Sequence, residues 1–293
     1  MPVLTLPARP PARLHSGAVV AGATSGVVAG GLVAGATSGV VAGAASRRLE
    51  RVLTGPVQPA RILGVFPAAV YLAAGDDVVA VLSRDAVRLP LAVVVPAATR
   101  GGPFAGIELG QPATVGGGSV LGVAVHRWWT PAQPPALVRP EHLRHRATLL
   151  QRALVVRRRA LAPAVAAALA EVTDGDDPAG AARALVGLGA GLTPAGDDVL
   201  GGLLLALRHL GRPWAADRLW AAVASEVPLA TTALSAALLA AAADGDAIGP
   251  AVGVLTSLAG HAPVGPALDA LLAVGASSGS DLAHGLLAGA RWR

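Results

Sequence analysis

Short runs of branched apolar residues, separated by polar turns, characterise residues 60–129. The runs RILGVF, AVYLA, VVAVL and LAVVVP are interrupted by Gly-Asp-Asp, Ser-Arg-Asp and Pro, and GGGSVLGVAVHRWW continues the pattern. Such runs at close intervals are typical of strands joined by tight turns. We therefore expect an antiparallel sheet or a small barrel in this part of the chain.

The pattern changes to Ala/Leu-rich segments with helical spacing after a connector that contains Pro131, Pro134, Pro135 and Pro140. Because Gly, Asp and Pro stand at most of the joins, the segments are readily delimited as helices. We expect helices over residues 142–172, 178–186, 195–210, 214–227, 231–243, 247–259, 264–274 and 280–290. The predicted fold class is α+β, with an N-terminal β-rich sheet or small barrel and a C-terminal all-α bundle around a buried central helix.

These patterns divide the chain into three parts: a low-complexity Ala/Gly/Val extension (1–46), a β-rich domain (47–135) and an α-helical domain with a Gly-rich loop (136–293). The extension contains AGATSGVVAG twice, at residues 21–30 and 34–43, too few copies for a repeat domain. Its uncharged stretch leaves open a membrane span or a secretory signal. Its Gly, Ser and Thr content disfavours both, so we expect a flexible or weakly structured extension and no membrane partner.

Composition excludes several kinds of chemistry. The 293 residues include no Cys, which removes disulfides, thiolate metal sites and Cys nucleophiles, and all 23 basic residues are Arg. The net charge is +5, but charged residues make up only 14% of the chain and aromatic residues 3%. This is poor material for a groove that binds nucleic acid, so we expect no nucleic-acid partner. We expect a cytoplasmic protein, although the lack of Cys is compatible with either redox setting.

The densest candidate site is the glycine-rich segment GLGAGLTPAGDD at residues 187–198, which precedes the apolar run VLGGLLLAL. Glycines permit positive φ angles, while Thr193 and Pro194 stand where an N-cap and a first-turn residue belong. Backbone amides at a helix N-terminus attract anions. We therefore expect an anion to bind here, with the ligand-binding residues Gly189, Gly191, Thr193, Gly196, Asp197 and Asp198.

The same segment has a purely structural interpretation, in which the glycines form a tight turn between packed helices and the two Asp residues complement the helix dipole. It is neither a Walker A nor a Rossmann fingerprint. No cofactor is certain. Mg²⁺ bridging Asp197 and Asp198 to a phosphate is an open alternative.

Two islands of hydroxyl groups stand at the starts of later helices. They contain the candidate ligand-binding residues Thr231, Thr232 and Ser235, and Ser277, Ser278, Gly279 and Asp281. Helix capping explains each island alone, and Ser278 with Asp281 resembles a capping box. Together with the glycine-rich segment, however, three such helix starts could converge on one anionic ligand.

Two other groups of polar residues give weaker signals. An Arg-rich stretch includes Arg144, Arg146, Arg152 and residues 157–159; we expect a solvated helix face, with binding of an acidic substrate or partner as the alternative. The His residues show no metal-binding spacing, so structural zinc is not expected.

Three segments resemble one bacterial family. GLGAGLTPAGDDVLGGLLLAL looks like the signature of a family first described as a domain of unknown function and linked to the AllH subunit of oxamate carbamoyltransferase. TTALSAALLAAAADGD and GASSGSDLAHGLLAGA are similar to its two later motifs, in the same order. The likeness covers roughly residues 47–293 and leaves the extension unmatched.

The sequence departs from the family at two positions: Ala190 stands where the family often has Pro, and Ala276 where it often has His. If that His transfers protons, the activity of this protein is altered. The resemblance implies carbamoyl transfer between oxamate and phosphate in purine or allantoin breakdown, a small anionic substrate, and partner subunits of the carbamoyltransferase.

We expect a carbamoyltransferase-type subunit in which the glycine-rich segment and both hydroxyl islands bind a carbamoyl or phosphate ligand, largely by positioning and electrostatics. The catalytic residues stay unknown. The alternatives are a non-catalytic scaffold or regulatory subunit, and an unrelated protein that binds a small anion or nucleotide.

Overall fold

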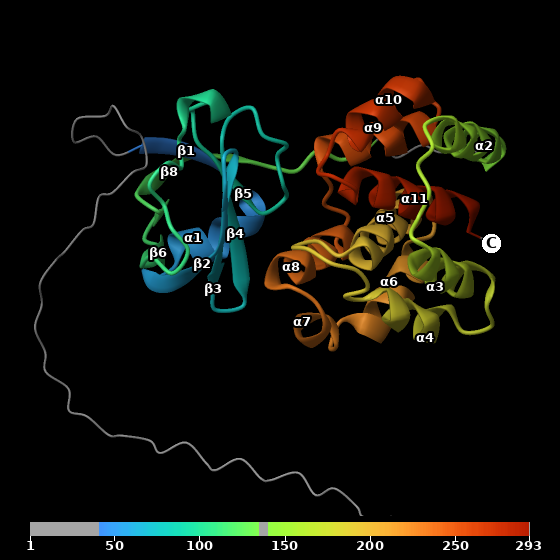
Figure 1. Cartoon of the computed structure of the whole chain (residues 1–293), viewed down its shortest axis with the longest axis horizontal. Coiled ribbons are helices and arrows are strands. Elements are labelled where there is room, and N and C mark those ends of the chain that lie inside the picture. The colour runs from blue at the N-terminus through green and yellow to red at the C-terminus, as the bar shows by residue number, and fades with distance from the viewer. Residues whose placement is uncertain (1–40, 135–139, 293) are drawn as a thin grey trace, which may run out of the picture.

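The computed structural model describes residues 41–134 and 140–292. Figure 1 shows a β-rich domain beside a helical domain. The membrane-span, signal and extension predictions for residues 1–40 lie outside the described residues. Within the described ranges, no helix has the length and apolar character needed to cross a membrane.

The β-rich domain is a closed barrel, which confirms the sheet-or-barrel prediction. The strands follow the order β1-β5-β4-β3-β2-β6-β7-β8 around the barrel; pairs β1/β8 and β4/β5 are parallel and the rest antiparallel. Alternate side chains point inward and fill the core. The strands are β1 (Val41–Ser46), β2 (Gln58–Phe66), β3 (Ala69–Ala74), β4 (Asp77–Leu82), β5 (Ala92–Val94), β6 (Ala113–Gly116), β7 (Ser119–Val120) and β8 (Val123–Trp129).

Strand β1 lies inside the segment that the sequence analysis assigned to the low-complexity extension. Its small residues pair with β5 on one side and with β8 on the other. A Cβ atom on Gly43 would lie 2.6 Å from Cγ1 of Val123, so the absence of a side chain permits this close packing. Low complexity therefore did not exclude an ordered strand. The short helices η1 (Arg47–Leu49), α1 (Glu50–Thr54) and η2 (Thr99–Gly101) complete the domain.

The helical domain forms around α5 (Ala195–His209), as predicted for a bundle with a buried central helix. Nearly every residue from Gly196 to Leu207 is buried, and α6, α8 and α11 all pack against this helix. The helices are α2 (Pro140–Val156), α3 (Pro163–Asp174), α4 (Pro178–Ala182), η3 (Arg183–Leu185), α5, α6 (Pro213–Val223), α7 (Val227–Ala230), α8 (Ala233–Ala243), α9 (Gly249–Leu258), α10 (Val264–Leu272) and α11 (Ser278–Arg291).

The single helix predicted over residues 142–172 is wrong, because the chain forms α2 and α3 instead. Arg158 adopts a left-handed φ of 53° after the end of α2. Pro163 then occupies the first turn of α3, where its missing N–H costs no hydrogen bond. The Ala/Leu periodicity on both sides of this break concealed it.

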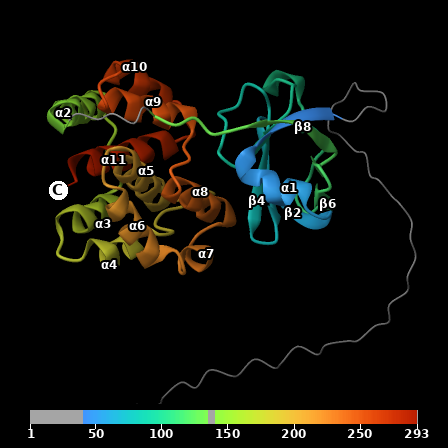
Figure 2. The same ribbon diagram turned by 180° about the vertical axis from the view of Figure 1, so that it is seen from behind.

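The two domains meet along α8, which is the helix nearest to the barrel in both views (Figures 1 and 2). Leu234 of α8 belongs to the barrel's hydrophobic core, with Leu238 packed against it. Arg48 reaches across the domains to Asp244 at 2.8 Å and to Asp246 at 3.2 Å. These contacts hold the barrel against both ends of α8.

Candidate functional site

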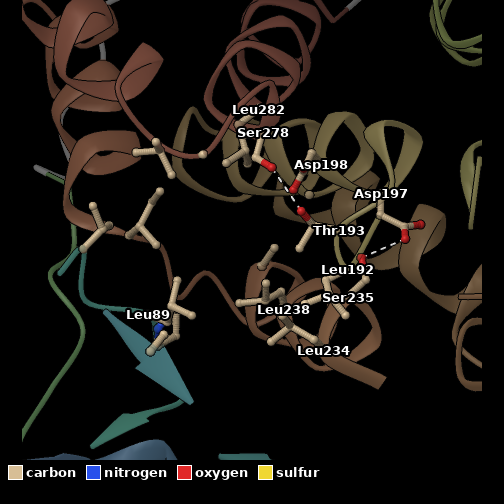
Figure 3. A pocket seen from close by; sticks show the side chains of 18 of the residues that line it. Leu89, Leu192, Thr193, Asp197, Asp198, Leu234, Ser235, Leu238, Ser278 and Leu282 are labelled. Carbon is tan, nitrogen blue, oxygen red and sulfur yellow. Dashed lines mark hydrogen bonds between the residues drawn. The ribbon is translucent and has the colours of Figure 1, made fainter. Parts of the chain in front are cut away.

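A cavity of about 660 Å³ lies between the barrel and the helical domain (Figure 3). The barrel contributes apolar side chains, among them Phe66, Tyr71 and Leu89. The helical domain contributes the first turns of α5, α8 and α11, which carry the polar groups. The cavity is therefore apolar over most of its wall and polar at one end.

Helices α5 and α11 reach this cavity side by side because glycines remove the side chains between them. A Cβ atom on Gly285 would lie 2.0 Å from the carbonyl oxygen of Val199, and one on Gly202 would lie 2.3 Å from that of Leu282. A Cβ atom on Gly289 would approach the next turn of α5. Gly285 packs against Val199, and Gly289, one turn later, packs against Leu203 and Leu207. Because these contacts advance along both helices in the same direction, α5 and α11 are parallel and present their N-termini together.

Helix α8 is also parallel to α5, and the buried carboxylate of Asp197 connects the two helices. One oxygen of Asp197 accepts the amide N–H of Gly187 at 2.8 Å. The other accepts the hydroxyls of Thr231 and of Ser235, the latter at 2.7 Å. Asp197 is only 2% exposed and has three donors, so its carboxylate holds the glycine-rich loop against the start of α8.

Asp198 faces the other way, toward α11 and the cavity (Figure 3). Nearby, the hydroxyls of Thr193 and Ser278 are hydrogen-bonded to each other at 3.0 Å, linking the loop before α5 to the first turn of α11. The Oδ2 atom of Asp198 is buried and has no protein partner among the described residues. Thr193, Asp198 and Ser278 define what we call the polar end of the cavity.

Burial raises the pKa of Asp198 to about 7. Hydrogen bonds from Ser278 and Thr193 act in the opposite direction, while the charges of Asp281 and Asp197 add to the rise. Asp281 is 5% exposed, and burial raises its pKa as well, against the lowering effects of Ser277 and His284. Near neutral pH, Asp198 can therefore both donate and accept a proton.

The glycine-rich loop has the backbone that its sequence predicted. Gly187, Gly189 and Gly191 have φ angles of 70°, 123° and 99°. A Cβ atom on Gly187 would lie 2.1 Å from the carbonyl oxygen of Ala230, and one on Gly196 would lie 2.1 Å from that of Leu185. The loop therefore needs glycine at these two positions for conformation or close packing.

Five amides of this segment have protein partners, which weakens the expected anion socket. Gly187 donates to Asp197, Leu188 to the carbonyl of Leu185, Gly196 to that of Leu188, and both Asp197 and Asp198 to that of Pro194. These N–H groups are not available to a ligand. An anion or carbamoyl group at this place would depend on the side chains of the polar end and on the helix dipoles.

The other predicted residues are helix caps, neighbours of caps or closely packed positions at the helix starts. Thr232 is the N-cap of α8, accepting the amide of Ser235 and donating to the carbonyl of Leu192 at 2.6 Å. The predicted caps at Thr193 and Ser278 are wrong by one residue, since Pro194 and Ser277 are the N-caps and neither makes a side-chain cap bond. Gly279 is buried against the carbonyl of Leu271.

The described residues include no group of three or more His, Asp or Glu arranged to hold a metal ion. Both oxygens of Asp197 already accept protein hydrogen bonds. The Mg²⁺ alternative at Asp197 and Asp198 therefore has no support in this arrangement.

Side chains with positive charge are missing from the described wall of the cavity, which includes neither Arg nor His. The Arg-rich stretch lies on and after α2, away from the cavity, with Arg144, Arg152, Arg158 and Arg159 exposed. Arg157 pairs with Asp269 at 2.6 Å. This arrangement fits a solvated face.

Sequence reasoning missed the barrel's contribution to the cavity. Phe66 ends β2, Tyr71 lies on β3, and Leu89 follows β4. An apolar residue in a strand carries no signal that separates a core position from a cavity wall. The 44% exposure of Phe66 becomes visible only in the folded chain.

Residues 185–290 match the family model described as oxamate carbamoyltransferase subunit AllH. The match agrees with the resemblance of the three motifs and covers just over a third of the chain. It includes the polar end and Asp197, whereas the barrel lies outside it. No solved structure matches the chain.

Proposed function

We propose that this chain is a subunit of a carbamoyltransferase of the oxamate type and that the polar end of the cavity binds the carbamoyl group of its ligand. The observation that carries the proposal is convergence: the three family motifs lie apart in the sequence, yet each contributes to the wall of one cavity. Thr193 and Asp198 come from the first motif, Ser235 from the second and Ser278 from the third. Asp197, Thr231 and Ser235 fix that arrangement from the adjacent side.

The polar end complements a carbamoyl group. In the Thr193–Ser278 pair one hydroxyl donates to the other, and the remaining hydroxyl proton is donated to the carbonyl oxygen of the ligand; the unpartnered Oδ2 of Asp198 accepts from its amino group. The parallel N-termini of α5, α8 and α11 add partial positive charge where negative charge develops on that oxygen during transfer. The polar end thus acts mainly by holding the carbamoyl group in position.

The phosphate of a carbamoyl phosphate ligand is balanced by these helix N-termini and by cations of partner subunits, because the described cavity wall carries no Arg or His. Partner subunits accordingly form part of the proposal, consistent with the word "subunit" in the family description. A chain that assembles with them but binds none of the small ligands would instead be a scaffold or regulatory subunit.

Calorimetry with carbamoyl phosphate, phosphate and oxamate tests the proposal, on the chain alone and together with partner subunits. We expect binding to at least one of them, weakened at least tenfold, about 1.4 kcal/mol, by Thr193→Val and by Asp198→Asn. Thr148→Val on the exposed side of α2 is the matched control and should leave affinity unchanged. Absence of binding in both settings would refute the carbamoyl site.

A further inference from the structure

The cavity is much larger than its polar end requires. Its volume of about 660 Å³ lies within the range that holds drug-sized ligands. A carbamoyl group bound by Thr193, Asp198 and Ser278, even with the few further atoms of oxamate, would leave most of this space without ligand contacts. The remaining volume therefore needs its own occupant.

The wall around that volume is apolar and is built by both domains. Phe66 and Tyr71 form an edge-to-face aromatic pair with ring centroids 5.7 Å apart. Leu234 and Leu238 of α8 lie across from the barrel loop that carries Leu89 (Figure 3). Phe66 and Val87 are 44% and 38% exposed, so the cavity contains large apolar side chains that a ligand would remove from water.

The charges on this wall select against an anionic occupant. Asp197, Asp198 and Asp246 line the cavity, and the described wall provides no Arg or His to balance a carboxylate or phosphate placed there. Asp246 pairs with Arg48, which is not part of this wall. The occupant that fits is uncharged, with one hydrogen-bonding end and an apolar body.

We propose, on the basis of the carbamoyl site proposed above, that the cavity binds an uncharged N-carbamoyl compound with a bulky apolar substituent. Its ureido group lies at Thr193, Asp198 and Ser278, and its substituent lies between the aromatic pair and α8. This compound is larger and less polar than oxamate.

Phenethylurea is a probe with these properties, with urea as the headgroup alone and N-carbamoylphenylalanine as an anionic counterpart. In calorimetry on the full chain, we expect phenethylurea to bind at least tenfold more tightly than either of them. Equal affinity for phenethylurea and urea would overturn the proposal, because the apolar wall would then contribute nothing. Tighter binding of the anion would overturn it too.

Leu238→Trp fills the apolar part of the cavity and removes no hydrogen bond of the polar end. We expect it to weaken phenethylurea binding at least tenfold, with an unchanged circular dichroism spectrum. Leu229→Trp is the matched control, since Leu229 is 90% exposed on α7 and does not line the cavity. Unchanged binding in a folded Leu238→Trp variant would place the probe elsewhere and overturn the proposal.

The two proposals fail separately. Binding of carbamoyl phosphate or oxamate without any preference for phenethylurea over urea refutes the apolar ligand and leaves the carbamoyltransferase proposal standing. If phenethylurea binds preferentially and the anions do not bind even in the presence of partner subunits, the carbamoyltransferase proposal is refuted and the apolar ligand stands.

Discussion

Asp197 and Asp198 are neighbours in the sequence, yet they lie in opposite environments. Consecutive residues of a helix point about 100° apart, which turns Asp197 toward α8 and Asp198 toward α11. Asp197 has three protein donors, and Asp198 has an unpartnered buried oxygen. The first carboxylate holds the structure together, and the second is the one that we propose meets the ligand.

Asp197→Ala should lower the free energy of unfolding by about 3 kcal/mol or more, because it leaves the buried donors of Gly187, Thr231 and Ser235 without their acceptor. Asp198→Asn serves as the paired control and should not lower the free energy of unfolding at pH 7, because it replaces a buried carboxyl whose ionisation the fold disfavours. Urea unfolding measures both. Equal losses for the two variants would contradict this division of roles.

Stability should also depend on pH through Asp198. Its pKa is about 7 in the folded chain and near 3.8 in the unfolded chain, so the folded state binds more protons between these values. The free energy of unfolding therefore falls as the pH rises from about 4 to about 7, and then levels off. Asp198→Asn should flatten this slope in urea unfolding series; an identical slope in the variant would assign the effect to another group.

At the scale of helices, the site depends on how closely α5 and α11 approach. Gly285→Ala should destabilise the chain by about 2 kcal/mol or more, since the new Cβ atom would lie 2.0 Å from the backbone of Val199. The control is Gly253→Ala in α9, where no atom lies within 4 Å and alanine should stabilise by about 0.5–1 kcal/mol. Thermal unfolding distinguishes the two variants. If Gly285→Ala left the free energy of unfolding unchanged, α5 and α11 could move apart at little cost in stability, which would contradict the prediction.

Helices were predictable to the extent that local signals determine them. The caps and glycines around residues 187–198 located the start of α5, and the hydroxyl islands located the starts of α8 and α11. The break before Pro163 was missed because the Ala/Leu pattern on both sides has the same period. Strand β1 was missed because its small residues are stabilised by distant partners, β5 and β8, rather than by local propensity.

Across the whole molecule, the ion pairs of Arg48 with Asp244 and Asp246 connect the barrel to the helical domain. Arg48→Glu places a like charge beside both carboxylates and should loosen the domains, which would increase the radius of gyration in small-angle scattering at unchanged helical content. Arg47→Glu is the neighbouring control, because Arg47 pairs only with exposed Glu50 among the ion pairs described. An unchanged radius in Arg48→Glu would show that apolar packing of α8 alone holds the domains.

The cavity itself could not have been predicted from the sequence. Its polar end was recognisable as three hydroxyl-rich helix starts, but the choice between Asp197 and Asp198 needed the orientation of α5. Its apolar wall comes from the barrel, whose closure and position over α8 depend on contacts between residues far apart in the chain. Such contacts leave no periodic pattern.

The most direct test of the account is a crystal structure of the chain, with its partner subunits if they are needed for binding, grown with carbamoyl phosphate. We expect electron density for the carbamoyl group within hydrogen-bond distance of the side chains of Thr193, Asp198 and Ser278. Density for the ligand at any other place, with the interdomain cavity holding only water, would contradict it.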